Sequence, residues 1–335
     1  MKTTLCAALV AMLLTAACSK QTTNTPRQSS TKPGVHAKWL ALAGKNNWKA
    51  YPQNPIITPG PKGTWDSWAV MSMTVVKVGD TFHLYYEGGL TGCRDLQIGH
   101  ASSSDGLNWV KDPENPVLRP GKAGEWDEGA TWDPFVIYED GLFKMWYGGE
   151  RKGVKQGWDY QCGYAVSKDG THFRKAGKIT TFARGNIGDM HVYHDRDTGR
   201  YYMYYWDRAM PKADRLRVAV SPNETGFDFE NAQTIRIENE TPGHRYTQVI
   251  KQAKTWYMFY GYENKGKTGL AISSDGLDWK AVKKYLLPSE DAEILPIDDD
   301  IIFMFYCPKG FQDEKDCDIR LAIFNGRIDN LAQKE

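Results

Sequence analysis

The sequence has no excess of charge of either sign. It carries 42 Lys and Arg residues against 41 Asp and Glu residues, which gives a formal net charge of +1 over 335 residues. Because no basic surplus is available to neutralise phosphates, this balance argues against a nucleic-acid partner. Hydrophobic residues make up 41% of the chain and charged residues 25%, so a sizeable core can be buried and wholesale disorder is excluded.

Long hydrophobic runs are scarce. Beyond the N-terminal region no segment approaches the roughly 18 uninterrupted apolar residues of a transmembrane helix, so no span is expected. The start of the chain combines the positive Lys2 with an apolar run from Leu5 to Ala17, which predicts a secretory signal peptide over residues 1–18. The protein is therefore expected to be exported.

The end of this segment, Leu14-Thr15-Ala16-Ala17-Cys18, resembles a bacterial lipoprotein cleavage site. Cys18 is then expected to carry a lipid anchor at the outer membrane, whereas ordinary cleavage after Ala17 would leave a periplasmic protein. The following residues are rich in Ser, Thr, Lys, Gln and Pro without apolar periodicity, so residues 19–40 are interpreted as a flexible tether. The anchor would be the only contact with a membrane.

Cysteine is also sparse, at six residues. No pair has the C-x-x-C spacing of a zinc site and no H-E-x-x-H motif is present, so neither a metal site nor a required cofactor is predicted. A structural calcium ion is left open, because no ligand spacing indicates one. Export permits disulfides. Cys307 and Cys317 bracket a strand-to-strand connection and are expected to pair, and a pairing of Cys93 with Cys162 is left open.

Aromatic residues are abundant, with 12 Trp, 18 Tyr and 12 Phe beside 32 Gly and 16 Pro, which favours short strands and tight turns. An apolar-aromatic strand ending in tyrosine recurs five times along the chain. A following strand leads in three copies into an Asp-Gly pair, which is a strong hairpin signal. The five strand-ending tyrosines are Tyr86, Tyr147, Tyr205, Tyr260 and Tyr306.

One longer copy bears on closure of the fold. The pattern from Trp48 to Asp66 recurs from Trp109 to Asp127, so residues near 47 to 57 match the strand that ends a repeat. The C-terminus, conversely, stops soon after the third strand of the last repeat, near Phe324. An N-terminal strand that completes the last sheet would remove this exposed edge. The sequence thus predicts one all-β domain over residues 41–330, a monomeric five-bladed β-propeller.

The repeat unit Trp-Asp … Pro-Phe-Val-Ile … Met-Trp-Tyr-Gly-Gly … Gly-Tyr-Ala-Val-Ser-x-Asp-Gly is similar to the repeats of five-bladed β-propeller glycoside hydrolases of families 43, 32 and 117. The resemblance covers residues from about 45 to 328. It implies a carbohydrate ligand and an active site in the central channel, built from a carboxylate base, a second aspartate and a glutamic acid on a further blade.

Aligning the repeats places Ser72, Asp133, Asp189, Tyr246 and Ala292 at equivalent positions of the innermost strands. Asp133 and Asp189 match the two aspartate segments that the resemblance implies. Serine and tyrosine stand where the base and the acid are expected. The remaining candidates for the missing catalytic roles are His191, Glu290 and Glu293.

Further side chains are candidates for binding the substrate. Arg245 and Tyr246 would either fill the channel or bind an acidic sugar. Trp68 and Trp132 are either core residues or platforms for sugar rings. Acidic residues at the ends of the second strands, Glu87, Glu150, Asp207 and Glu263, should lie on the same face. Together with Ser72, the residues Trp68, Trp132, Arg245, Tyr246 and Glu263 form the predicted binding set.

Three functions remain open at this point. An exo-acting glycosidase on polysaccharide-derived oligosaccharides is favoured, with Asp133 and Asp189 central. A non-catalytic carbohydrate-binding propeller would keep the channel without its acid and base. A polysaccharide lyase would use His191, His244, Arg245 and Tyr246 to neutralise a uronate and remove a proton.

Overall fold

The computed structural model describes residues 33–45, 47–92, 95–153, 159–181, 186–262, 265–287, 289, 291–308 and 317–333. The predicted signal peptide with Cys18, and also Cys93, Glu263 and Glu290, lie outside the described residues. The chain divides into two units, Met1–Ser30 and Thr31–Glu335, and all that follows concerns the second. Among the described residues, no helix is long and apolar enough to cross a membrane.

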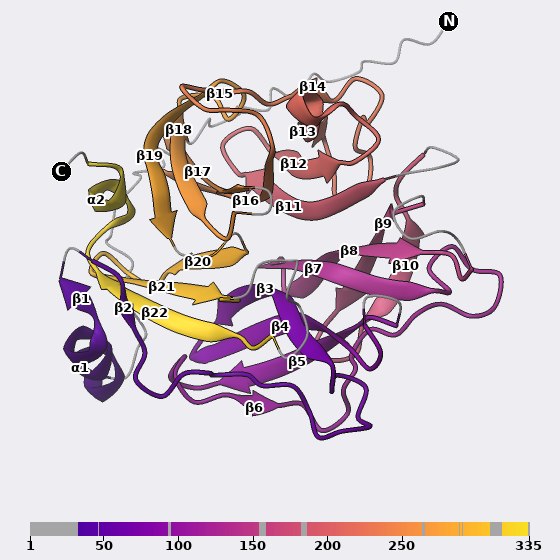
Figure 1. The fold of residues 1–335 in the computed structure, drawn as a ribbon, viewed down its shortest axis with the longest axis horizontal. Helices are drawn as coiled ribbons and strands as arrows, with labels where there is room; N and C mark the ends of the chain where they lie inside the picture. The colour runs from indigo at the N-terminus through magenta and orange to yellow at the C-terminus, as the bar shows by residue number, and fades with distance from the viewer. Residues whose placement is uncertain are drawn as a thin grey trace, which may run out of the picture. The chain divides into compact units, whose positions relative to one another are not determined.

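Five antiparallel sheets follow one another along the chain and surround a common centre (Figure 1). The first strands of the five blades, β3, β7, β11, β16 and β20, lie innermost, and this confirms the five-bladed propeller predicted from the repeats. Blade 1 contains β3 (Ala69–Val78), β4 (Thr81–Gly89), β5 (Gln97–Ser103) and β6 (Val110–Lys111). Blade 2 contains β7 (Ala130–Glu139), β8 (Leu142–Glu150), β9 (Gln161–Ser167) and β10 (Arg174–Lys178). Blade 3 contains β11 (Ile187–Asp195), β12 (Arg200–Asp207), β13 (Leu216–Ser221) and β14 (Gln233–Thr234).

The last two blades have five strands each. Blade 4 contains β16 (His244–Gln252), β17 (Thr255–Tyr262), β18 (Thr268–Ser273) and β19 (Trp279–Leu287), with β15 (Ile237–Glu238) beside β19. Blade 5 contains β20 (Ala292–Pro296), β21 (Ile301–Tyr306) and β22 (Arg320–Asn325), completed by β1 (Gly44–Lys45) and β2 (Lys49–Ala50). Three short helices complete the described elements: α1 (Pro33–Leu42), the 3-10 helix η1 (Lys212–Asp214) and α2 (Ile328–Ala332).

The N-terminal strands close the ring as the sequence predicted. β2 pairs antiparallel with β22, and β1 pairs with the same strand in parallel. The repeated segment explains the attachment: the Asn54 amide exchanges two hydrogen bonds of 2.8 Å with the backbone of Leu321. Its repeat partner Asn115 makes the same two bonds, also of 2.8 Å, with the backbone of His100. The chain ends are therefore joined by the device that joins successive strands within blade 1.

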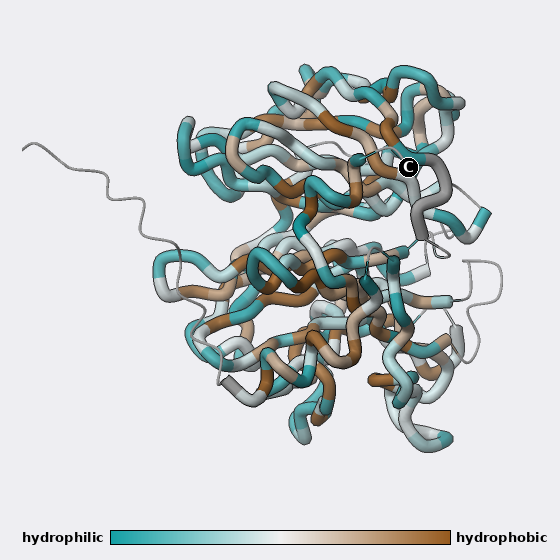
Figure 2. Tube along the Cα trace, turned by 90° about the vertical axis from the view of Figure 1, so that its left-hand side faces the viewer, coloured by the Kyte–Doolittle hydropathy of each residue, from teal (hydrophilic) through white to brown (hydrophobic). Residues whose placement is uncertain are grey.

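The Asp-Gly pairs build turns, as their sequence pattern indicates. In blade 1 the Asp105 carboxylate accepts the N–H groups of Leu107 and Asn108, and the Ser103 hydroxyl accepts that of Gly106. Gly106 has a φ of 69°, which a side chain would strain. Tyrosine and phenylalanine side chains of the second strands fill the space between neighbouring sheets. Hydrophobic residues concentrate along the strands, whereas the connecting loops are mostly hydrophilic (Figure 2).

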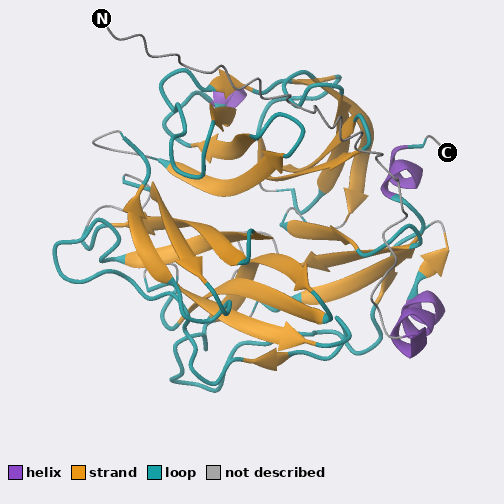
Figure 3. Cartoon of the chain, turned by 180° about the vertical axis from the view of Figure 1, so that it is seen from behind, coloured by secondary structure: helices purple, strands orange, loops and turns teal. Residues whose placement is uncertain are grey.

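Residues 33–40 do not belong to a flexible tether, and this part of the sequence prediction is wrong. They form most of α1, one of the few helical segments among the strands (Figure 3). Trp39 is fully buried against Phe82 and Phe303, and its indole Nε1 donates a 2.7 Å hydrogen bond to the Asp105 carbonyl. Val35 and Leu42 pack beside Trp39 on the same core cluster, but the exposed Leu40 interrupts the apolar face, so the sequence pattern gave no clear helix signal.

Cys307 and Cys317 form a disulfide, the pairing that the sequence favoured. It connects the segment after β21 with the segment before β22 and lies in the core between blades 5 and 1. Cys162 is a buried free thiol in β9.

Candidate active site

The inner strands of blades 1 to 4 deliver one residue each to the centre through the same backbone irregularity. Ser72, Asp133, Asp189 and Tyr246 have φ values of 43°, 44°, 50° and 49°. At each of them the pairing with the second strand shifts register, as in a β-bulge. A left-handed backbone is uncommon for side chains of this size and is typical of functional sites. Sequence alignment identified these four equivalent positions, and the structure brings them together.

A small cavity lies where these residues meet. Its walls include Ser72, Asp133, Asp189 and Tyr246, together with Asp291 of blade 5. The cavity volume is about 50 Å³, enough for a few water molecules, and the cavity opens to solvent.

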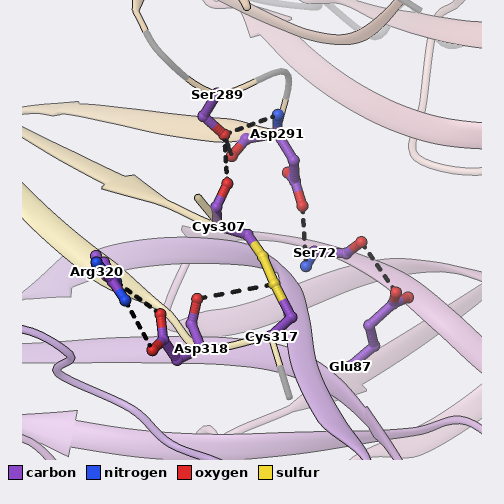
Figure 4. Close-up of a disulfide and its surroundings, with 8 residues drawn as sticks. All are labelled: Ser72, Glu87, Ser289, Asp291, Cys307, Cys317, Asp318 and Arg320. Atoms are coloured by element: carbon purple, nitrogen blue, oxygen red, sulfur yellow. Dashed lines mark hydrogen bonds and ion pairs between the residues drawn. A yellow bond between two sulfur atoms is a disulfide. The ribbon is translucent and has the colours of Figure 1, made fainter. Parts of the chain in front are cut away.

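Blade 5 contributes Asp291, which the sequence alignment missed. The alignment selected Ala292, but β20 begins at that residue with regular pairing, so the preceding aspartate reaches the cavity. One Asp291 carboxylate oxygen accepts the Ser72 N–H at 3.1 Å (Figure 4). Ser289 fixes the segment, because its hydroxyl accepts the Asp291 N–H and donates to the Cys307 carbonyl at 2.7 Å. The disulfide thereby supports the loop that carries this carboxyl group.

Glu87 supplies a carboxylate on the side where serine replaces the expected aspartate. It lies at the end of β4, is 4% exposed, and accepts a 3.0 Å hydrogen bond from the Ser72 hydroxyl. Its other oxygen accepts the Asp133 N–H, also at 3.0 Å. The sequence placed Glu87 only among acidic residues on this face. Its contact with two inner strands could not be read from strand periodicity.

Asp133 and Asp189 continue this chain of contacts into blade 4. The Asp133 carboxylate accepts the Asp189 N–H at 2.9 Å. Asp189 in turn forms a bidentate ion pair with Arg245, with distances of 2.8 and 3.0 Å to Nε and Nη2. The guanidinium is buried between the rings of Trp206 and Tyr246. Arg245 therefore compensates the charge of Asp189 and is not itself directed into the cavity.

Two carboxyl groups of the cavity have strongly perturbed acidity. Burial, and then the neighbouring Asp189 carboxylate, raises the pKa of Asp133 from 3.8 to about 7. Burial, and then the carboxylates of Asp133 and Asp189, raises the pKa of Asp291 to about 7. Both side chains keep partial contact with solvent. Near neutral pH, this pair can thus hold one proton next to an ionised carboxylate.

His191 lies in the cavity wall, but its geometry argues against the predicted role as an acid. Its Nε2–H donates to the Val249 carbonyl of blade 4 at 3.0 Å, and its ring packs on Phe135 with centroids 4.2 Å apart. Burial lowers the pKa of His191 to about 3, so the ring is neutral at physiological pH. Its one proton connects two blades and is not available to a substrate.

Glu293 also lies in the wall, where it contacts blade 1. It is 8% exposed and accepts a hydrogen bond of 3.5 Å from the Thr74 hydroxyl. Burial raises the pKa of Glu293 well above its usual range, so this side chain is a protonated, hydrogen-bonded connector between blades 5 and 1.

The two tryptophans of the predicted binding set are packed away from the cavity. Trp132 is 6% exposed and meets Tyr160 edge to face at 4.8 Å. Trp68 packs against the cluster of buried side chains between blades 5 and 1. Trp206, which stacks on Arg245, was not singled out from the sequence, because nothing in its local pattern distinguishes it from a core residue.

Among the described residues, no group of three or more His, Cys, Asp or Glu side chains is arranged to hold a metal ion. The described residues that line the cavity offer several carboxyl groups and the phenol of Tyr246.

Comparison with known proteins adds relatives at low identity. No protein-family model matches the chain. The uncharacterized protein Rv1502 of Mycobacterium tuberculosis is 28% identical over 248 residues, which cover 70% of this chain and 80% of that protein. A 1,2-β-oligomannan phosphorylase of Thermoanaerobacter sp. is 29% identical over 182 residues, covering 52% of this chain and 60% of the phosphorylase.

Solved structures agree on the fold. The β-1,2-mannobiose phosphorylase of Listeria innocua, in complex with β-1,2-mannobiose, superposes with a TM-score of 0.63 at 15% identity and covers 83% of this chain and 97% of its own. A second solved structure comes from work on the GH130 family of mannoside phosphorylases, which contains glycoside hydrolases that target β-1,2 mannosidic linkages in Candida mannan. It superposes with a TM-score of 0.60 at 16% identity and covers 85% of this chain and 94% of its own. At these identities the likeness establishes the fold alone.

Proposed function

We propose that this protein is a carbohydrate-active enzyme that cleaves glycosidic bonds at the mouth of its central cavity. The observation that carries the proposal is the pair Asp133 and Asp291, two partly accessible carboxyl groups with a pKa of about 7 in one cavity. Glycoside cleavage needs one carboxyl group that donates a proton to the leaving oxygen and one carboxylate that activates the attacking group. No cofactor is required for this chemistry.

Asp133 is assigned as the proton donor and Asp291 as the base. Burial and the neighbouring Asp189 carboxylate disfavour the ionised form of Asp133 and raise its pKa. We therefore assign the proton to Asp133, and Asp291 across the cavity takes a proton from water. Asp189 and Arg245 hold the backbone and the charge around the donor and act as positioning residues.

Water is the favoured attacking group, which makes the reaction a hydrolysis. The described residues that line the cavity include several carboxyl groups and neither Lys nor Arg, so a phosphate dianion would meet like charge there. Phosphorolysis is the second candidate, because a sequence relative and a solved structure of the same fold are phosphorylases. The resemblance to families 43, 32 and 117 remains a prediction.

β-1,2-Linked mannosides are the proposed substrates, because the relatives described above act on β-1,2-linked mannosides. Exo action on polysaccharide-derived oligosaccharides remains part of the proposal, carried over from the resemblance of the repeat unit. Export and a lipid anchor at Cys18 remain part of the proposal, supported by the sequence from Leu14 to Cys18.

A product assay with β-1,2-mannobiose and longer β-1,2-mannan oligosaccharides, with and without inorganic phosphate, tests the proposal. Hydrolysis predicts free mannose at a rate that phosphate does not change, whereas mannose 1-phosphate formed only with phosphate would establish the second candidate. Ultraviolet-absorbing unsaturated sugars would instead indicate a lyase. That reading needs a deprotonated Tyr246, and burial raises the pKa of Tyr246 well above its usual value. Saturable binding without any product would indicate a carbohydrate-binding propeller.

A further inference from the structure

The face of the propeller opposite the cavity has five junctions between neighbouring blades. Each first strand begins near the cavity and ends in the hairpin to its second strand, so these hairpins lie at the opposite face. At the junction of blades 5 and 1, helix α1 covers the gap. Trp39 inserts between Phe82 and Phe303, with ring centroids at 6.0 and 5.3 Å.

Two acidic residues complete the seat of this helix. Lys38 pairs with the Asp105 carboxylate at 3.3 Å, and His36 lies 3.1 Å from the Asp298 carboxylate. His36 and Trp39 are three residues apart and so lie on one side of the helix. An aromatic side chain flanked by basic residues is thus what this acidic and aromatic junction binds.

The junction of blades 3 and 4 has the same construction. When the repeats are aligned on the tyrosines that end their second strands and on their Ser-x-Asp-Gly turns, each residue that seats α1 has a counterpart of similar chemistry. The counterparts of Asp298, Phe303, Phe82 and Asp105 are Asp197, Tyr202, Trp256 and Asp275.

The correspondence extends to a lysine on the first strand. Lys251 lies over the Trp256 ring at 5.1 Å, as Lys77 lies over Phe82 at 5.6 Å. In blades 3 and 4, Lys251 also pairs with Asp195 at 2.8 Å and with Asp197 at 2.9 Å. The seat is therefore more polar than that of α1: Lys251 and Tyr193 cover the Trp256 ring, which is 3% exposed, and Lys254 joins the acids of the rim.

In contrast to the seat of α1, this second seat is open. A cavity of about 340 Å³ lies over it, lined by the four counterparts and by Asp195, Lys251 and Ser274 among others. We call it the blade 3–4 groove. Two of its acids are well exposed: the Asp197 side chain is 78% accessible, and Asp275 is also exposed.

Among the described residues, other junctions are filled by the chain itself. Between blades 2 and 3, the buried Lys144 ammonium bridges Glu139 at 3.0 Å and Glu224 at 2.7 Å. Between blades 4 and 5, Ile328 and Leu331 of α2 pack into the core cluster. The blade 3–4 groove thus corresponds to the site that α1 occupies between blades 5 and 1, but no helix of the described residues covers it.

We propose that the blade 3–4 groove docks a short helical segment of another protein, one that carries an aromatic residue next to a basic residue. Two observations support this occupant: the equivalent seat on the same molecule holds such a segment, and the exposed acids of the rim complement its charge. The aromatic side chain lies against the partly exposed Tyr202 and displaces Lys251 from the Trp256 ring, and its basic neighbour pairs with Asp275 or Asp197. Docking there leaves the catalytic cavity on the opposite face open to substrate.

The test uses a labelled peptide with the sequence of residues 33–43 as the probe, titrated onto the complete protein, whose own α1 already fills the first seat. Fluorescence anisotropy should show saturable binding. D197K should weaken it at least tenfold, and S274W, which places a large side chain in the groove, should abolish it. D140K, a charge reversal at the exposed hairpin of blade 2, is the matched control and should leave binding unchanged. A peptide with alanine in place of Trp39 should not bind.

Three results would overturn the proposal. The first is no saturable binding of the peptide to the complete protein. The second is binding that survives both D197K and S274W, since the peptide would then occupy another site. The third is competition by β-1,2-mannobiose for the peptide on the wild-type protein, because the groove would then be a sugar site. Circular dichroism of each variant confirms that the propeller is folded.

Discussion

Replacing Asp133 by asparagine should make the protein more stable at neutral and alkaline pH while it removes activity. In the folded state the pKa of Asp133 is about 7, against 3.8 for an unperturbed aspartate, because the site is buried and contains other carboxylates. Between about pH 4 and pH 7 the folded state therefore binds more protons than the unfolded state. Stability falls as the pH rises through this window, and the loss is complete above pH 7.

The size of the effect follows from the shift. Three pKa units correspond to at most about 4 kcal/mol, and the partial exposure of the side chain reduces this to about 1–3 kcal/mol. The asparagine oxygen can still accept the Asp189 N–H, so the hydrogen bond of 2.9 Å is retained. For a domain of this size the gain corresponds to a rise in Tm of about 2–6 °C at pH 8. At pH 4, where the native carboxyl is protonated, the difference should vanish.

Thermal unfolding of the wild type and D133N at pH 4 and pH 8 measures this difference. Asp195 provides a control of opposite sign: burial alone would raise its pKa, but hydrogen bonds from Lys251 and Thr198 lower it overall. D195N should therefore destabilise the protein at pH 8, with a smaller effect at acid pH. Equal or lower stability of D133N at pH 8, with the same difference at pH 4, would refute the reasoning about the cavity.

Three further predictions concern stability. R245M should lower the free energy of unfolding, measured with urea, by about 3–5 kcal/mol, because it leaves the buried Asp189 carboxylate without its bidentate partner. The double variant R245M/D189N should recover part of this loss, and additive losses of stability would contradict the account. W39A should cost about 3–5 kcal/mol, since the indole is fully buried under α1, and an unchanged Tm would show that the helix does not hold blades 5 and 1 together. Reduction of the Cys307–Cys317 disulfide, which spans a sequence separation of 10, should cost about 2.5 kcal/mol of unfolding free energy by the chain-entropy relation; no change on reduction would contradict a structural role.

Much of the fold could be predicted because a propeller repeats its information. Five copies of one strand pattern predict the five blades. The copy from Trp48 to Asp66 predicts the closing strand, because Asn54 and Asn115 donate equivalent hydrogen bonds to the backbone of a neighbouring strand. Helix α1 carried no comparable signal. Its position depends on the contact of Trp39 and its neighbours with a junction that is distant in the sequence, and local periodicity does not predict such a contact.

The site was predicted where it depends on repeat position and missed where it depends on tertiary contact. Asp133 and Asp189 follow from alignment of the inner strands. Asp291 lies one residue before its aligned position, because blade 5 lacks the register shift of the other blades. Glu87 contacts two residues of the cavity wall from a second strand. The bulges at Ser72 and Asp133 place the Ser72 hydroxyl and the Asp133 N–H against its carboxylate.

The most direct test of the central claim is the rate of β-1,2-mannobiose cleavage by the wild type, D133N and D291N, compared at pH 7. The account predicts that each substitution lowers kcat by at least about 100-fold, with the folded state intact, because each removes a carboxyl group that transfers a proton. Near-wild-type rates in both variants would contradict the assignment of Asp133 and Asp291 as the catalytic pair.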